Sequence, residues 1–169
     1  MSRTTTTNHT IPFRLRGFPL LSAGNTFNFL AAAPGLWAHL KVYAEGGENG
    51  VHAHPDEDHL FVVLDGEATF VDVDGDLTVV GALEGMMVPR GAAYAFRSTG
   101  DGNLVMLRVG APVDPALADW DDVNPETGIP DDMMRRTTSD GAPAEGRDPA
   151  VNKTGALPGV PIPGRFFGE

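Results

Sequence analysis

The part of the chain that most restricts its fold is residues 36–109, where short apolar runs alternate with turn residues. Runs such as 68–73 and 77–80 are rich in β-branched and aromatic side chains and show almost no helical period. The Asp74-Gly75 pair between these two runs predicts a hairpin, because both residues accept the positive φ angles that primed turns need. Many short strands at regular spacing predict an all-β jelly-roll or barrel.

The segments on either side of this region predict less regular structure. Residues 1–35 are interpreted as an N-terminal arm, within which residues 24–33 are equally compatible with a short helix and with a strand. Nine of the fourteen prolines follow Gly110, so residues 111–169 are predicted to be an irregular Pro/Gly-rich C-terminal extension. Its apolar side chains are costly to leave in water, which favours packing on the barrel or on a partner subunit.

Composition and charge exclude several classes of partner. The chain has 169 residues, no cysteine and a formal net charge of −11. Such an acidic chain is not expected to bind nucleic acid or an anionic membrane. No apolar run is long enough to span a bilayer and no signal peptide is recognisable, so we expect a cytoplasmic protein. Without cysteine, thiolate ligands and cysteine nucleophiles are excluded.

Three of the five histidines of the chain lie close together, at His52, His54 and His59. In an extended strand His52 and His54 project from the same face. Pro55 and the acidic residues 56–58 are typical of a turn, whose carboxylates face solvent or, alternatively, orient a histidine ring. A tight return would bring His59 beside the other two imidazoles. This pattern predicts a divalent metal site, the alternative being a surface His-x-His that binds metal only adventitiously.

The same stretch resembles the first motif of the cupin superfamily. In that motif a glycine precedes a His-x-His pair, and a short acidic spacer, a further ligand and a closing glycine follow. The matching residues are Gly46, His52, His54, His59 and Gly66. His59 falls where most cupins carry a glutamate ligand.

The second cupin motif is matched in part. Its Pro-x-Gly-x-x-His pattern has a counterpart in residues 89–94, where Tyr94 replaces the expected histidine. Ser98 stands where an asparagine often ends the motif, and Leu83 where a glycine usually precedes it. The resemblance covers residues 36–110 and implies a single cupin barrel, a double-stranded β-helix, over that range. Many cupins are homodimers, so a homodimer is expected.

The resemblance also implies that His52, His54 and His59 hold a metal inside the barrel. A set of neutral imidazoles leaves the full charge on a divalent ion, which would polarise an anionic chelating substrate. Iron(II) is the first expectation, with zinc, nickel, copper or manganese as alternatives. Tyr94 is implied to point toward the metal, where a phenol serves as ligand, as acid or base, as hydrogen-bond donor or merely as part of the wall.

The predicted substrate pocket is largely apolar. Phe61, Val63 and Phe96 are expected to line it. His39 lies outside the motif and either contacts a ligand or substrate or is an orienting or surface group. Arg108 either binds a substrate carboxylate or forms a solvent-facing salt bridge.

Together these features predict a metal-dependent cupin enzyme that acts on a small aromatic or carbonyl substrate, in the first place an iron-dependent dioxygenase. One alternative is a non-redox isomerase, cyclase or lyase in which the metal is a Lewis acid and Tyr94 is the base. The other is a non-catalytic cupin that binds a small molecule. Oxygen uptake separates the first two possibilities, and the absence of any conversion identifies the third.

Overall fold

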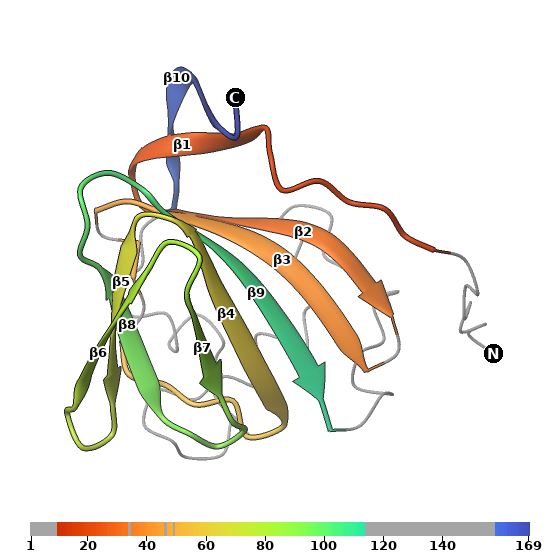
Figure 1. Ribbon diagram of the computed structural model, residues 1–169, viewed down its shortest axis with the longest axis vertical. Coiled ribbons are helices and arrows are strands. Elements are labelled where there is room, and N and C mark those ends of the chain that lie inside the picture. The colour runs from red at the N-terminus through yellow and green to blue at the C-terminus, as the bar shows by residue number, and fades with distance from the viewer. Residues whose placement is uncertain (1–9, 34, 46, 49, 114–157) are drawn as a thin grey trace.

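The computed structural model describes residues 10–33, 35–45, 47, 48, 50–113 and 158–169 (Figure 1). All regular structure in these ranges is β-strand, and no helix in them is long and apolar enough to cross a membrane. The ten strands are β1 (Phe18–Ala23), β2 (Asn25–Ala33), β3 (Leu36–Tyr43), β4 (Glu57–Asp65), β5 (Glu67–Asp72), β6 (Leu77–Gly81), β7 (Gly85–Val88), β8 (Tyr94–Ser98), β9 (Leu104–Pro112) and β10 (Val160–Phe167).

Two antiparallel sheets enclose the main core. One has the strand order β2-β3-β9-β4-β7 and the other the order β6-β5-β8. Side chains from both sheets meet in one buried cluster, with Tyr43 and Val63 from the larger sheet and Phe70, Val80 and Phe96 from the smaller one. Because alternate residues of each strand point inward, two sheets that face each other bury every second side chain of each strand. The predicted all-β jelly-roll is confirmed.

The outer face of the larger sheet is covered at one end by residues of strands β1 and β10. Leu40 and Val42 of β3 and Val105 of β9 pack there against Leu21 of β1. Strand β10 pairs antiparallel with β1, and Figure 1 shows this two-stranded sheet at one end of the barrel. The register joins Phe18 to Phe167. The last residues of the chain therefore form a strand, where the sequence predicted irregular structure.

The N-terminal region contributes directly to the barrel. Residues 25–33, for which helix and strand were equally compatible with the sequence, form strand β2 and pair antiparallel with β3. The fold therefore extends beyond the predicted 36–110 range at its N-terminal side. Residues 114–157 of the predicted C-terminal extension lie outside the described residues.

Two glycines lie in turns, and the sequence predicted the first of these turns. Gly75, with a φ angle of 85°, lies in the turn between β5 and β6, which pair as the predicted hairpin. Gly66, with a φ angle of 80°, joins β4 to β5, and a Cβ atom there would lie 2.5 Å from the carbonyl oxygen of Asn103. Both the backbone conformation and the close approach require glycine at position 66.

Candidate metal centre

The candidate site is built on the inward face of the five-stranded sheet. Glu57, His59 and Phe61 alternate along β4 and all are buried. Arg108 of β9 is paired with Phe61 on one side and with His39 of β3 on the other. Since residues in register on neighbouring strands project from the same face, these side chains meet inside the barrel.

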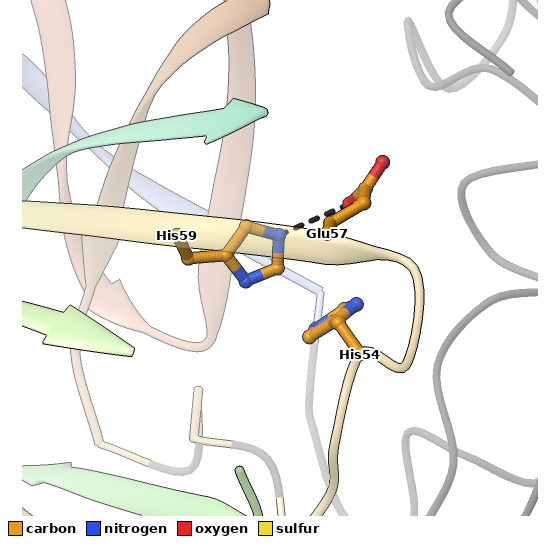
Figure 2. Close-up of side chains that lie close together, drawn as sticks. All are labelled: His54, Glu57 and His59. Atoms are coloured by element: carbon orange, nitrogen blue, oxygen red, sulfur yellow. Dashed lines mark hydrogen bonds and ion pairs between the residues drawn. The ribbon is translucent and has the colours of Figure 1, made fainter. Parts of the chain in front are cut away.

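Three buried side chains bring possible ligand atoms together. One ligand atom each from His54, Glu57 and His59 lies within 4.8 Å of the others. His54 lies in the loop before β4, and Figure 2 shows its ring turned toward the two residues of that strand. The relative exposures of His54, Glu57 and His59 are 4%, 1% and 1%. This group is the candidate metal centre.

Glu57 is a structural member of the strand and not a solvated turn acid. Strand β4 begins at Glu57, which places its side chain two residues before that of His59 on the same face. Its Oε2 atom lies 3.0 Å from His59 Nε2, the contact dashed in Figure 2. Its Oε1 atom accepts a hydrogen bond of 3.3 Å from Trp37 Nε1. The predicted turn is therefore shorter than residues 56–58.

The Arg108 guanidinium lies between the two histidines of this group. Its Nη2 atom is 2.9 Å from His54 Nε2, 3.0 Å from His59 Nδ1 and 3.2 Å from His59 Nε2. The guanidinium carbon lies 5.3 Å from the centre of the Trp37 ring and 5.4 Å from that of Phe61, within cation–π range. Of the two predicted roles for this residue, the solvent-facing salt bridge is not found among the described residues.

Both histidines of the group are held neutral at physiological pH. Burial, followed by the positive charge of Arg108, lowers the pKa of His54 well below its usual value. The same two causes lower the pKa of His59 to about 4, against an opposing effect from Glu57. A neutral imidazole keeps a lone pair for a metal ion or a hydrogen-bond donor. The two rings are therefore still in the ligating form at pH 6.5, the unperturbed pKa of histidine, where an ordinary histidine is half protonated.

These shifts predict that the metal-free protein loses stability in mild acid. The unfolded chain takes up protons at an ordinary histidine pKa of about 6.5, while folded His59 does so only near 4. Stability is therefore complete above the unfolded pKa and falls as the pH drops toward the folded one. Between pH 7 and pH 5 we expect His59 alone to cost about 2 kcal/mol. Urea denaturation with EDTA at both pH values measures the loss.

The variant His59→Gln serves as the control for this effect, because glutamine does not titrate in that range. Its stability should fall by less than that of the unmodified protein between the same two pH values. Equal stability of the unmodified protein at pH 7 and pH 5 would contradict the assignment of a buried neutral His59.

The structure places His52, the first predicted ligand, beside this group. Its Nδ1 atom donates a hydrogen bond of 2.8 Å to the Gly50 carbonyl, and its ring centre lies 5.2 Å from that of His54. Backbone hydrogen bonds in both directions join it to Tyr94. Among the described residues, His52 is not part of the set of ligand atoms within 4.8 Å.

Tyr94 lies inside the barrel, with its ring centre 4.6 Å from that of His52. The residue is 4% exposed, and its buried hydroxyl has no hydrogen-bond partner in the described part of the chain. Burial raises the pKa of the phenol, and the Arg108 charge opposes this rise. A phenol in this environment stays protonated at neutral pH and has a hydrogen bond to donate.

The remaining predicted pocket residues have different surroundings. Phe61, Val63 and Phe96 belong to the buried core cluster. The ring centres of Phe61 and Phe96 are 5.9 Å apart. His39 is fully buried, and its ring stacks on that of Trp37 at 4.8 Å between centres. Phe61 belongs to this core and also lies beside the candidate metal centre, with its ring centre 6.1 Å from that of His59.

Trp37 was not singled out from the sequence as a contributor to the site, and Glu57 was considered only as a turn acid that faces solvent or orients a histidine ring. Trp37 hydrogen bonds to Glu57, and its ring also packs on His59 at 5.5 Å between centres. The sequence did contain a signal for Glu57. Alternate residues of a strand lie on one face, so a strand that includes His59 and Phe61 and continues to residue 57 places Glu57 on the same face. For Trp37 the corresponding signal is its place on the strand face of His39.

The donors fit a divalent metal in type and in spacing. Two imidazole nitrogens and one carboxylate oxygen are borderline and hard ligands suited to iron, zinc or manganese. The separation of 3.0 Å between His59 Nε2 and Glu57 Oε2 suits two neighbouring ligands with bonds of about 2.0–2.2 Å to one ion. The Arg108 Nη2 atom lies against the same two imidazoles, 2.9 Å from His54 Nε2 and 3.2 Å from His59 Nε2.

Comparison with known proteins identifies the family of the central part of the chain. Residues 39–110 match the family model described as Cupin domain. The protein YdbB of Bacillus subtilis is 38% identical over 52 residues, which are 31% of this chain and 46% of that protein. The chain thus matches less than half of the length of this curated relative.

Solved structures with a similar fold include two proteins of known domain type. One is a Klebsiella pneumoniae protein with a double-stranded β-helix domain. It is 21% identical, with a TM-score of 0.46, and the match covers 57% of this chain and 78% of that protein. The other is the cupin domain of Cnp3 from Schizosaccharomyces pombe. It is 19% identical, with a TM-score of 0.49, and the match covers 52% of this chain and 64% of that domain. The family match from β3 to β9, together with the two facing sheets, places residues 39–110 of this chain in the cupin superfamily.

Proposed function

We propose that this protein is a metal-dependent enzyme, and specifically an iron-dependent dioxygenase that acts on a small aromatic or carbonyl substrate bearing an anionic group. The observation that carries this proposal is the buried set of two imidazoles and one carboxylate formed by His54, His59 and Glu57. A set of two histidines and one carboxylate with open positions is typical of non-haem iron(II) oxygenases. Iron held there would supply open coordination positions and Lewis acidity.

The proposed ligand set differs in one member from the three histidines expected from the motif. Glu57 replaces His52, so the set carries one negative charge. A carboxylate lowers the net charge of the site by one and favours iron or manganese more than three imidazoles do. Trp37 donates a hydrogen bond to the Oε1 atom of this carboxylate and orients it, as partners behind metal ligands commonly do.

The walls around the ligand set suit an aromatic anion. The rings of Trp37 and Phe61 flank Arg108 and offer apolar surface beside its positive charge. Lys41 lies on the same inward face and is 4% exposed, with its Nζ atom 4.9 Å from the centre of the Tyr43 ring. Two cations on the inner face of a protein with a formal net charge of −11 favour an anionic group in the barrel.

Tyr94 favours a second candidate function. Its buried hydroxyl has no partner among the described residues, and a non-redox isomerase, cyclase or lyase would use it in proton transfer. Because burial raises the pKa of this phenol, it would act in the resting protein as a hydrogen-bond donor or acid and not as a base. The same donor could hold the oxygen atom of a substrate in the dioxygenase.

The test uses the purified full-length chain reconstituted with iron(II) and 2,4-pentanedione as the first probe, followed by a panel of aromatic 2-hydroxy acids and diketones. A dioxygenase consumes one oxygen molecule for each substrate cleaved, measured with an oxygen electrode and by mass spectrometry of the products. Turnover under strict anaerobiosis would replace the proposal with the non-redox alternative. Binding of probes without conversion in either condition would leave a small-molecule-binding cupin. His59→Ala is the inactive control.

A further inference from the structure

The Arg108 guanidinium uses a lone pair that a metal ion would need. Its Nη2 atom can only donate, so the contact of 2.9 Å to His54 Nε2 engages the acceptor nitrogen of that ring. The same atom lies across the His59 ring, 3.0 Å from Nδ1 and 3.2 Å from Nε2. A neutral imidazole has a single nitrogen with a free lone pair. For His54 the nitrogen that accepts this hydrogen bond cannot bind metal at the same time.

We propose that Arg108 is a built-in competitor for metal at this site: its guanidinium holds His54 and His59 together in the metal-free protein and must leave when a divalent ion binds. The inference depends on the proposed metal site. Arg108 then determines how tightly metal is bound, and metal binding releases a positive side chain inside the barrel.

The surroundings of Arg108 explain why it is displaceable. In the described part of the chain its hydrogen bonds go to neutral imidazoles, and its buried Nε atom has no partner. The two ion pairs found there are His59 with Glu57 and Arg90 with Asp58, so no carboxylate of the described residues forms an ion pair with the Arg108 guanidinium. A charged hydrogen bond to a neutral ring is weaker than a bidentate ion pair. Arg108 therefore occupies the site without being fixed in it.

Electrostatics makes the two cations mutually exclusive. A guanidinium and a divalent ion sharing the same imidazoles would repel each other strongly, since the charges would be only a few ångströms apart in a poorly solvated interior. Arg108 is only half-buried along its length, and its stem leaves β9 between His39 and Phe61. Part of the Arg108 side chain is therefore exposed while its backbone stays in the sheet.

The consequence is an affinity difference that can be measured without any catalytic assay. Arg108→Met keeps an unbranched apolar stem but removes the competing charge. It should bind Zn²⁺, chosen because it has no redox chemistry, at least tenfold more tightly than the unmodified chain. Arg97 is exposed on β8, and Arg97→Met makes the same change of net charge away from the site. Its affinity should stay within twofold of the unmodified value.

The experiment is isothermal titration calorimetry of metal-free full-length protein with Zn²⁺, supported by competition with a chelator. Arg108→Gln is measured in parallel, so that the result does not depend on the folding of one variant, and circular dichroism confirms that each variant is folded. Equal or weaker binding by the folded Arg108 variants, with the unmodified chain still binding Zn²⁺, overturns the competitor role but leaves the metal site standing. No binding by any of them overturns both proposals.

A second readout follows the guanidinium itself. Arg108 lies over the Trp37 ring, so its departure should change the fluorescence of that indole. In a Trp120→Phe background, which removes the other tryptophan of the chain, Zn²⁺ should shift Trp37 emission in the protein with Arg108. The shift should be at least halved in Arg108→Met. An equal shift in both proteins would mean that the arginine does not move.

Discussion

Replacing Glu57 by glutamine should lower the affinity of the protein for iron(II) or Zn²⁺ by at least about 100-fold, more than the loss of an outer partner of a metal ligand usually costs. Glutamine has the same shape as glutamate and can still accept the hydrogen bond from Trp37. It removes the negative charge and the anionic ligand atom 3.0 Å from His59 Nε2. Dioxygenase turnover should fall with metal content, which elemental analysis after dialysis measures.

Asp58 provides a matched control for this variant. It follows Glu57 on the same strand but points outward, where it pairs with Arg90 at 2.8 Å. Asp58→Asn makes the same change of charge one residue away and should leave metal affinity within threefold. If Glu57→Gln kept stoichiometric metal while His52→Ala lost it, the original three-histidine set would be the right one and the carboxylate would be only an orienting group.

The fold could be predicted from the sequence because its signals are local. Alternation of apolar residues and the Asp74-Gly75 turn identify strands and a hairpin without any knowledge of what lies opposite. The sequence of residues 24–33 was compatible with a helix or a strand. Residues 25–33 form a strand because they pair with β3, and local sequence patterns do not reveal such a tertiary contact. Residues 160–167 form a strand for the same reason, since their partner β1 lies at the other end of the chain.

The candidate metal centre was only partly predictable. His54 and His59 are conspicuous in the sequence as histidines beside a strand, and they lie together in the barrel. Glu57 was assigned to a turn because its neighbours are Pro55 and two aspartates, residue types that favour turns. Pairing with β9 outweighs that local preference, because it extends β4 by two residues before His59, so that the strand begins at Glu57.

The position of Arg108 depends on registers that no single strand reveals. It contacts His59, which lies 49 positions earlier in the chain, and His54, which lies 54 positions earlier. Two strand pairings bring these residues together. In the sequence an arginine next to leucine and valine on a closing strand is as compatible with an outward salt bridge as with an inward contact. Which of the two occurs is decided by the β4–β9 register, in which Arg108 is opposite Phe61.

In the β3–β9 register Gly110 has less room for a Cβ atom than any other described glycine, and Gly110→Ala should destabilise the protein by about 3 kcal/mol, at the upper end of the usual cost of overpacking. Gly110 is opposite Trp37 on β3, and a Cβ atom there would lie 2.0 Å from Trp37 Cζ2. The indole cannot yield freely, because it is 2% exposed and hydrogen-bonded to Glu57. Urea denaturation of the metal-free proteins measures the loss.

Gly81→Ala is the matched control for this effect, since Gly81 ends a strand and its added Cβ atom would meet only Glu84 Oε2, at 3.6 Å. Its cost should stay below about 0.5 kcal/mol, as is usual for substitutions without a clash. Because a displaced Trp37 would also release Glu57, Gly110→Ala should bind Zn²⁺ more weakly than Gly81→Ala does. Equal stability and equal metal affinity of the two variants would show that the Trp37 ring does not hold the carboxylate in place.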